Sequence, residues 1–310
     1  MKVLVFGSIN IDETYLVDHI VRPGETLQSK GFSRNAGGKG ANQAAALAAT
    51  GIGVCLAGTI GKDGLWVLDE VGKFKVNCDL VCIDENVSTG KATIMVSDEG
   101  ENSILLYAGC NHLIDEEYAD SVLAKFGKGD WVVVQNEISC TPHIIRKAHD
   151  LGLKVLFNPS PYDANMRCDY NIALTDVLIA NETEACALCG LPSGSLKGID
   201  DAAGIETVSS RLKVLCPNAC IVVTMGASGS ICFFGEKSAA DMSGELFKQD
   251  ACKVKAVDTT AAGDTFLGYF LSSYLKHGNP ARALEAASEA ASVAVTKKGA
   301  MKSIPIGLET

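Results

Sequence analysis

The 310-residue sequence has fewer basic than acidic residues, with 27 Lys and Arg against 37 Asp and Glu and a formal net charge of −10. Binding to nucleic acid without sequence preference needs a basic surface, because contacts to phosphates supply the affinity. The composition therefore argues against a nucleic-acid partner. The sequence also lacks any run of like charges long enough to predict a charged tail.

Long apolar runs are missing as well. The opening segment has four consecutive apolar residues, Val3–Phe6, which is too short for a signal peptide and indicates a buried strand. No other segment is long enough to cross a bilayer. We therefore expect no membrane partner and a cytoplasmic location.

Two nucleotide-binding signatures are absent. No G-x-G-x-x-G follows a predicted strand, which disfavours a dinucleotide-dependent dehydrogenase. The glycine cluster around Lys39 fails the template of a phosphate-binding P-loop, because Ser33 stands at the first Gly position and Gly40 at the Ser/Thr position.

Cysteine is abundant instead, with twelve residues scattered along the chain. The nearest approach to a zinc-site spacing is formed by Cys186 and Cys189 with Cys216 and Cys220. Cys186 and Cys189 fall in a short predicted helix, however, and Cys220 opens a predicted strand. We interpret the cysteines as reduced thiols, most of them in the core.

Short apolar runs alternate with helical patterns, in a chain that is 47% hydrophobic and 21% charged. Strands that are apolar throughout and separated by helices indicate a parallel sheet covered on both faces. The sequence thus predicts an α/β fold, doubly wound around a mostly parallel central sheet, in one domain of residues 1–310. The expected strands cover residues 3–6, 132–134, 155–157, 177–180 and 221–224, and the expected helices include residues 41–50 and 143–150.

Four further segments, residues 14–17, 27–32, 92–96 and 104–107, have the pattern of half-exposed strands. The last two are joined by a polar segment with a glycine, which predicts a hairpin. We expect these strands, within about residues 13–33 and 88–108, to form a small accessory sheet outside the main body.

Polar residues follow each predicted core strand at its carboxyl end. In open α/β sheets this edge binds ligands, although any one such residue could simply cap the next helix. The residues concerned are Asn10, Asp12, Glu137, Asn158, Asn181, Glu184, Thr224 and Gly226.

The stretch of residues 258–266 places small residues and Gly263 directly before the carboxylate of Asp264. Phe266, Phe270 and Tyr274 recur at helical spacing after it, and Gly278 ends the pattern. A helix N-terminus here would present free N–H groups that bind anions. A carboxylate beside an anion hole can deprotonate a hydroxyl next to a phosphate. The alternative is a glycine-rich turn in which Asp264 only favours the helix dipole.

A second glycine cluster spans residues 35–42. Gly37, Gly38 and Gly40 allow close approach of the backbone to a ligand, and Lys39 and Asn42 add donors. These groups suit a polyhydroxylated molecule or a phosphoryl group in transfer. The other interpretation is a tight turn into an Ala-rich helix.

Taken together, these motifs make the chain resemble the ribokinase-like carbohydrate kinases, the PfkB family, over nearly its whole length. The first two matches are the sugar-binding strand end and the glycine signature of the family. Next come the N-x-x-E motif and the nucleotide loop. The last are the C-terminal signature and the tail segment near the adenine and potassium sites. In this order they are residues 7–12, 35–42, 181–184, 224–229, 258–266 and 294–300.

The resemblance implies roles for these residues. Asp264 would be the general base, with an anion hole formed by the N–H groups of Ala262 and Gly263. The sugar would be bound by Asn10, Asp12, Gly38, Lys39, Asn42, Glu137 and Asp264. ATP and Mg²⁺ would lie near Asn181, Glu184, Thr224, Gly226, Ala227, Gly229, Gly263 and Ser288. A K⁺ ion would be held, mostly through backbone carbonyls, by Asp258, Thr260, Ala294, Lys297, Gly299 and Ser303.

The activity that the resemblance implies is ATP-dependent phosphorylation of the 5-hydroxyl of D-ribose. The accessory sheet would be a lid over the sugar and the contact of a homodimer. Alternatives are the same transfer to deoxyribose, another sugar or a nucleoside, and a sugar-binding protein without turnover. The chain departs from the family pattern at Ser139 and Cys140, where a proline is common, and at Cys110, within a usual Gly-Ala-Asn.

Overall fold

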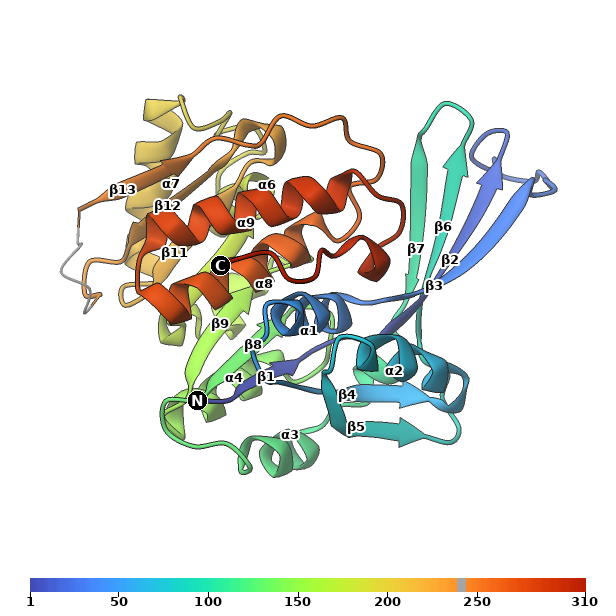
Figure 1. Cartoon of the computed structure of the whole chain (residues 1–310), viewed down its shortest axis with the longest axis horizontal. Coiled ribbons are helices and arrows are strands. Elements are labelled where there is room, and N and C mark those ends of the chain that lie inside the picture. The colour runs from blue at the N-terminus through green and yellow to red at the C-terminus, as the bar shows by residue number, and fades with distance from the viewer. Residues whose placement is uncertain (239–243) are drawn as a thin grey trace.

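The chain folds into a large sheet flanked by helices and a small separate sheet beside it (Figure 1). The computed structural model describes residues 1–238 and 244–310. The large sheet has nine strands in the order β13-β12-β11-β10-β9-β8-β1-β4-β5. In chain order they are β1 (Val3–Phe6), β4 (Val54–Gly61), β5 (Asn77–Asp84), β8 (Trp131–Gln135), β9 (Lys154–Asn158), β10 (Val177–Asn181), β11 (Cys220–Thr224), β12 (Ser230–Phe234) and β13 (Leu246–Gln249).

All neighbours in this sheet run parallel except β11–β12 and β12–β13. Each predicted core strand is therefore confirmed, and the sheet is mostly parallel as expected. The chain winds outward from β1 in both directions, through β4 on one side and β8 on the other. The switch in strand order thus lies between β1 and β8, where open α/β sheets place their ligands.

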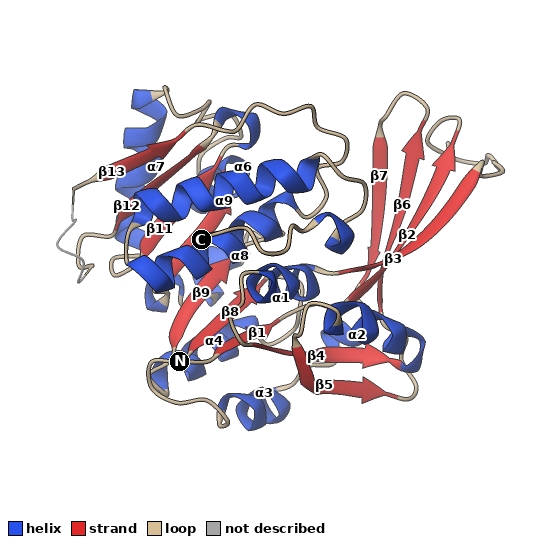
Figure 2. Ribbon diagram, in the orientation of Figure 1, coloured by secondary structure: helices blue, strands red, loops and turns tan. Residues whose placement is uncertain are grey.

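Helices cover both faces of the large sheet (Figure 2). Successive side chains of a strand point to opposite faces: Val3 and Val5 pack in one core, and Leu4 and Phe6 in the other. The first core includes residues of α1 (Lys39–Ala49), α2 (Leu65–Gly72), α8 (Ala262–His277) and α9 (Pro280–Val295). The second includes residues of α3 (Glu116–Leu123), α4 (Thr141–Asp150), α5 (Met166–Asp169), α6 (Glu182–Leu188) and α7 (Ala202–Leu215).

The small sheet has the strand order β3-β2-β6-β7 and stands at one end of the molecule (Figure 1). Its strands are β2 (Asn10–Val17), β3 (Gly31–Gly37), β6 (Gly90–Ser97) and β7 (Asn102–Tyr107). A turn at Gly100 joins β6 to β7, which confirms the predicted hairpin. The accessory sheet of the sequence analysis is thus present, and we call it the lid sheet from here on.

The predicted strand over residues 27–32 was wrong in its bounds. β3 begins only at Gly31 and continues to Gly37, into the glycine cluster for which a tight turn was the alternative interpretation. Pairing with β2 explains this shift, because Asp12 lies opposite Asn35 and Asn10 opposite Gly37. Cross-strand pairing outweighs the local preference of glycine for turns.

The two predicted helix ends near the glycines are confirmed with small changes. α8 begins at Ala262, before Asp264 rather than after it, and ends at Gly278 in a left-handed conformation. α1 begins at Lys39, directly after Gly38, whose φ of 90° and close neighbours Ser8 and Asn10 leave no room for a Cβ.

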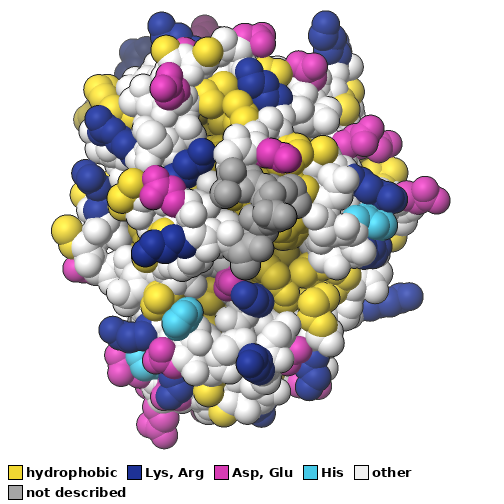
Figure 3. Space-filling view, turned by 90° about the vertical axis from the view of Figure 1, so that its left-hand side faces the viewer, with side chains coloured by type: hydrophobic (Ala, Val, Ile, Leu, Met, Phe, Trp, Pro, Cys, Tyr) yellow, Lys and Arg dark blue, Asp and Glu magenta, His cyan; other side chains and the backbone are white. Residues whose placement is uncertain are grey.

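The molecular surface carries mixed charges. On the face drawn in Figure 3, Lys and Arg side chains are interspersed with Asp and Glu rather than gathered into a patch of one sign. In the described part of the chain, no helix combines the length and apolar composition needed to span a bilayer. All twelve cysteines are unpaired, and Cys186, Cys189, Cys216 and Cys220 are buried as expected.

Candidate active site

Asp264 lies at the N-terminus of α8, where it is only 8% exposed. Its two carboxylate oxygens accept hydrogen bonds from consecutive residues of α1: Oδ2 from Asn42 Nδ2 at 3.1 Å and Oδ1 from Gln43 Nε2 at 2.9 Å. Ala261 precedes the helix in a left-handed conformation. The first N–H groups of a helix have no intrahelical partners. The N–H of Ala262 donates to Thr259 O at 3.2 Å, so the N–H of Gly263 is the backbone donor left next to the carboxylate.

The ends of β1, β2 and β8 supply the polar groups predicted to bind a sugar. Ser8 Oγ donates to Glu137 Oε2 at 2.5 Å, and the backbone N–H of Lys39 donates to the same oxygen at 3.3 Å. Asn10 Oδ1 accepts from Asn111 Nδ2 at 2.7 Å. These contacts bring the loop after β1, the start of α1 and the loop after β8 into one place.

The carboxylates of Asp264 and Glu184, which are buried, and those of Asp12 and Glu137, which are half-buried, surround the half-buried Lys39 ammonium. Burial alone would lower the pKa of the Lys39 ammonium, but Asp264, Glu137, Glu184 and Asp12 outweigh it and raise the pKa above its usual value. Burial, with the nearby charges of Glu137 and Asp264, raises the pKa of Asp12 to about 7. Carboxylates can accept hydrogen bonds from the hydroxyls of a ligand, and the Lys39 ammonium is the one charged group of this set that attracts a phosphate.

A polar cavity of about 220 Å³ opens beside Asp264. Asn181 caps α6 by accepting the N–H of Glu184 at 2.8 Å, and the Glu184 carboxylate accepts the N–H of Asn181 in return. Burial raises the pKa of Glu184, although these hydrogen bonds and Lys39 oppose the rise. The lining residues are Lys39, Asn158, Ser160, Ile179, Ala180, Asn181, Glu184, Thr224, Thr259, Ala261, Gly263 and Asp264.

An apolar cavity of about 300 Å³ adjoins the polar one, and Thr224, Thr259 and Gly263 line both. Its walls come from the loop after β11 and from α8 and α9. The predicted nucleotide residues Gly226, Ala227, Gly229, Gly263 and Ser288 lie here, with Ala262. Together the two cavities form a polar compartment at Asp264 that continues into an apolar one. This arrangement suits a nucleotide whose phosphates lie toward Asp264.

The residues predicted to hold a monovalent cation are partly brought together. Asp258 Oδ1 accepts from Thr260 N at 2.9 Å, and Asp258 Oδ2 accepts from Gly299 N at 2.9 Å. Burial favours a higher pKa for Asp258, but these hydrogen bonds hold the pKa below its usual value. The carboxylate thereby ties the loop before α8 to the segment after α9.

The other members of this set make local contacts. Lys297 N donates to Ala294 O at 3.1 Å, and Ser303 Oγ donates to Ala300 O at 2.7 Å. Oxygen atoms of the backbone and of hydroxyls are hard ligands that suit an alkali cation. Among the described residues no group of three or more His, Cys, Asp and Glu side chains could hold a metal ion. The donor set therefore fits a cation bound by carbonyls better than a divalent ion in a protein cage.

Sequence reasoning missed several side chains of the site. Gln43 touches Asp264, Asn111 binds Asn10, Ser160 lines the polar cavity and Cys252 lines the apolar one. Asn111 could be recognised only as part of the family pattern around Cys110. The Cys110 thiol is buried and donates to Val87 O at 3.1 Å. Ser160 follows a predicted strand end and could have been found in that way.

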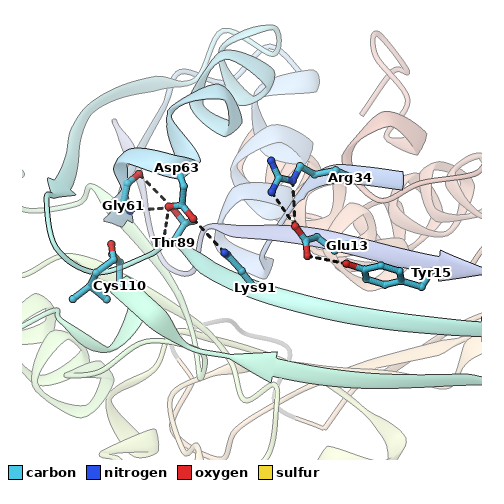
Figure 4. A network of polar contacts seen from close by, with 9 residues as sticks. Glu13, Tyr15, Arg34, Gly61, Asp63, Thr89, Lys91 and Cys110 are labelled. Atoms are coloured by element: carbon cyan, nitrogen blue, oxygen red, sulfur yellow. Dashed lines mark hydrogen bonds and ion pairs between the residues drawn. The ribbon is translucent and has the colours of Figure 1, made fainter. Parts of the chain in front are cut away.

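The root of the lid sheet is fixed by a polar network (Figure 4). Asp63 Oδ1 accepts from both the N–H and the hydroxyl of Thr89, at 2.9 and 2.8 Å, and Thr89 Oγ1 accepts from Gly61 N at 2.9 Å. Lys91 Nζ lies 3.4 Å from Asp63 Oδ2. This network joins the end of β4 to the start of β6, where the chain enters the lid sheet.

A second group shown in Figure 4 stiffens the lid sheet itself. Glu13 Oε1 accepts from Arg34 Nη2 at 2.9 Å, across the paired strands β2 and β3. The same carboxylate accepts from Tyr15 Oη at 3.5 Å. These contacts join β2 and β3, the lid strands that contain Asp12 and Asn35.

Comparison with known proteins gives matches over nearly the whole chain. The model of the pfkB family carbohydrate kinases matches residues 1–307. A ribokinase of Schizosaccharomyces pombe is 36% identical over 328 residues, covering 100% of this chain and 96% of that one. A ribokinase structure from Cryptococcus neoformans in complex with ADP superposes with a TM-score of 0.83 at 34% identity, covering 98% and 97% of the two chains.

A third similar protein has been solved with both ribose and ATP bound. The structure of Arabidopsis thaliana ribokinase complexed with ribose and ATP has a TM-score of 0.80 and 27% identity, covering 98% of this chain and 96% of that chain. The match to the family model and the identity to curated relatives extend over essentially the whole sequence. The chain therefore belongs to the pfkB family of carbohydrate kinases, enzymes that transfer a phosphoryl group from ATP to a sugar.

Proposed function

We propose that this kinase phosphorylates the 5-hydroxyl of D-ribose with ATP as phosphoryl donor, and that residues 1–310 act as one catalytic unit. The observation that carries the proposal is the placement of Asp264. Its carboxylate is held by two amide donors at a helix N-terminus, beside a polar cavity that continues into an apolar one.

In this proposal Asp264 accepts the proton of the sugar hydroxyl as that oxygen attacks the γ-phosphorus. The N–H groups of Ala262 and Gly263 and the ammonium of Lys39 stabilise the negative charge of the transferring phosphoryl group. Phosphoryl transfer needs little covalent chemistry from a protein, since positioning and charge stabilisation dominate. Closure of the lid sheet over the sugar excludes water, the competing acceptor.

Sugar recognition is proposed to use Asn10, Asp12, Gly38, Asn42 and Glu137 together with Lys39 and Asp264. Carboxylates and amides arranged around a buried pocket can accept and donate to every hydroxyl of a pentose. Asn10 and Asp12 lie on β2, so the first strand of the lid sheet carries part of the sugar site. Lid position and sugar affinity are thereby linked.

The apolar cavity with Gly226, Ala227, Gly229 and Ser288 would take the adenine and ribose of ATP, with Thr224 toward its phosphates. Mg²⁺ binds proteins through one or two carboxylates while substrate phosphates and water fill its other positions. Glu184 and Asn181, on the wall of the polar cavity, fit that mode. Bound there, Mg²⁺ would neutralise phosphate charge.

K⁺ is proposed to bind between the Asp258–Thr260 loop and the segment that contains Ala294, Lys297, Gly299 and Ser303. The Asp258 carboxylate accepts hydrogen bonds from Thr260 N in its own loop and from Gly299 N in the second segment, which already ties the two segments together. An ion there would touch neither substrate. It would brace the loop that ends in the anion-hole residues Ala262 and Gly263.

A homodimer is proposed to form through the lid sheet. Ile104, Leu105 and Leu106 of the edge strand β7 are 55%, 71% and 55% exposed, and Phe32 of β3 is 56% exposed. An exposed apolar edge strand favours pairing with another chain. A second lid sheet would cover this surface.

The test is a panel of sugars assayed for ADP release with ATP and MgCl₂. D-ribose is expected to give the highest kcat/KM, and 2-deoxy-D-ribose, other pentoses, hexoses and nucleosides lower values. Phosphorylation at the 5-position is checked by phosphorus NMR of the product. Turnover of another sugar in preference to ribose would contradict the ribose assignment, and no turnover of any sugar would contradict the kinase proposal.

A further inference from the structure

Two adjacent amide side chains fix the direction in which Asp264 points. Asn42 holds one carboxylate oxygen at 3.1 Å and Gln43 holds the other at 2.9 Å. Both residues are buried, Gln43 completely. Asn42 belongs to the proposed sugar site, but Gln43 has no role in it. With each oxygen holding one hydrogen bond, the remaining lone pairs are left for the substrate.

The orientation of the Gln43 amide is set in turn by Gln135 at the end of β8. Gln135 Nε2 donates to Gln43 Oε1 at 2.7 Å. Because that oxygen accepts from Gln135, the NH₂ group of Gln43 must face Asp264 and Asn158 Oδ1, which lies 3.2 Å away. A reversed amide would place its oxygen against the carboxylate.

Gln135 is itself held in place. Thr141 Oγ1 donates to its backbone carbonyl at 3.1 Å, and the side chain is fully buried. Its Oε1 occupies the space beside Gly7, where an added Cβ would lie 2.0 Å from that oxygen. Oε1 is also a buried atom without a hydrogen-bond partner among the described residues. The Gln135 side chain is therefore held with its Oε1 lacking a hydrogen bond while its Nε2 donates to Gln43.

We propose that Gln135 and Gln43 form a relay of positioning residues that orients the carboxylate of Asp264 toward the sugar hydroxyl. Gln135 fixes the Gln43 amide, and Gln43 fixes Asp264 Oδ1. This inference rests on the proposed function, in which Asp264 is the base. Neither glutamine contacts substrate, so their loss should lower kcat and leave the affinities for sugar and ATP nearly unchanged. A displacement near 1 Å at a reacting group costs on the order of 10²-fold in rate.

The test uses Gln43→Met, Gln135→Met and the double variant, since methionine keeps the length of the side chain and removes the amide. Gln43→Met is expected to lower kcat by ~10- to 100-fold, and Gln135→Met by a smaller factor. Both KM values should stay within about threefold of wild type. Gln249→Met, which removes a half-buried glutamine of β13, serves as the control and should leave kcat unchanged.

The double variant separates a relay from independent packing effects. If Gln135 acts only through Gln43, the double variant should be no slower than Gln43→Met, because residues that act as a unit are not additive. Multiplied effects of the two substitutions would overturn the relay. A wild-type kcat in a folded Gln43→Met protein would do the same. If Gln43→Met does not fold, Gln43→Asn keeps the amide and withdraws it by one methylene.

A structural measurement, which needs no turnover, tests this inference separately from the proposed function. Crystal structures of Gln43→Met and Gln135→Met are expected to show the Asp264 carboxylate rotated relative to wild type. An unchanged carboxylate in both would overturn the relay even if the enzyme phosphorylates ribose. An enzyme inert toward every sugar would contradict the proposed function, and the carboxylate orientation in the variants would still decide the inference.

Discussion

At the scale of single residues, two carboxylates of the candidate site have different neighbours. Asp264 is surrounded by amide donors, whereas Asp12 lies among like charges. Burial and these like charges raise the pKa of Asp12. In our proposal the two acidic side chains have different tasks, since Asp264 accepts the proton and Asp12 binds the sugar.

Replacing Asp264 by asparagine tests the first of these tasks. Asp264→Asn keeps the shape but cannot take the proton, so kcat should fall by ~10² to 10⁴-fold. Binding of ribose should persist, since the other sugar-binding groups are intact, and calorimetric titration can measure it. A variant that retains near wild-type kcat would remove Asp264 from the role of base.

Asp12→Asn tests the environment of the second carboxylate through stability. The folded protein raises the pKa of Asp12 from 3.8 to about 7, so between these values the folded state holds more protons than the unfolded state and stability falls as pH rises. Asparagine does not titrate. The free energy of unfolding of the variant should therefore rise relative to that of wild type, by up to about 4 kcal/mol, as pH rises from about 4 to 7. Above pH 7 the difference should stay constant.

The measurement is the unfolding free energy by urea titration at pH 5 and pH 8. Asp69→Asn, a change at an exposed position of α2, is the control and should show no such difference between the two pH values. A gap between Asp12→Asn and wild type that is the same at both pH values would contradict the raised pKa.

At the scale of secondary-structure elements, the sequence analysis found five buried strands but missed β4 and β12, which are nearly as buried. Strands β1, β8, β9, β10 and β11 are apolar runs and were found. β5 alternates between exposed and half-buried residues at the edge of the sheet, so it lacks that signal. Pro280 occupies the first turn of α9, where its missing N–H has no cost.

The same reasoning explains which site residues were found. Asp264 and Lys39 stand in glycine-rich motifs, which indicate a ligand-binding loop from the sequence alone. Gln43 lies in an Ala-rich helix and acquires its contact only through the fold, from a residue 221 positions away. No local pattern marks such a contact.

Thr89 tests the connection between the body and the lid sheet. Thr89→Val keeps the shape but leaves the N–H of Gly61 without its acceptor and removes one donor to Asp63, which should cost about 1–3 kcal/mol of stability. Because the lid strand β6 starts at the next residue, the ribose KM should rise about three- to tenfold by our estimate from the same lost hydrogen bonds. Thr89→Ser retains the hydroxyl and should behave like wild type. An unchanged ribose KM in Thr89→Val would show that this network does not position the lid.

Potassium activation tests the loop before α8. Activity is assayed in buffer free of sodium and potassium, and KCl is titrated at constant ionic strength. Activation should saturate, and Asp258→Ala should abolish it, because the variant loses the hydrogen bonds that join the loop to Gly299. A flat response of wild type to KCl would remove the cation site while the kinase assignment stands.

At the scale of the whole molecule, the two roles that we propose for the lid sheet depend on each other. Residues proposed to bind the sugar lie on its strand β2, and its edge strand β7 exposes apolar side chains. A second copy that covers β7 would also restrain the lid over the sugar. Assembly and catalysis should therefore be affected together by a change on β7.

Leu105→Lys tests this coupling. Leu105 is 71% exposed on β7, and a charge there should oppose burial against a second chain. Sedimentation velocity should show a dimer for wild type and a shift to monomer for the variant. The ribose KM should rise with the loss of the dimer, while the ATP KM stays nearly constant, because the nucleotide cavity lies on the body. Val214→Lys on α7, at a position 69% exposed, is the matched control and should remain a dimer. A wild-type monomer with full activity would contradict the dimer and show that the lid closes without a partner.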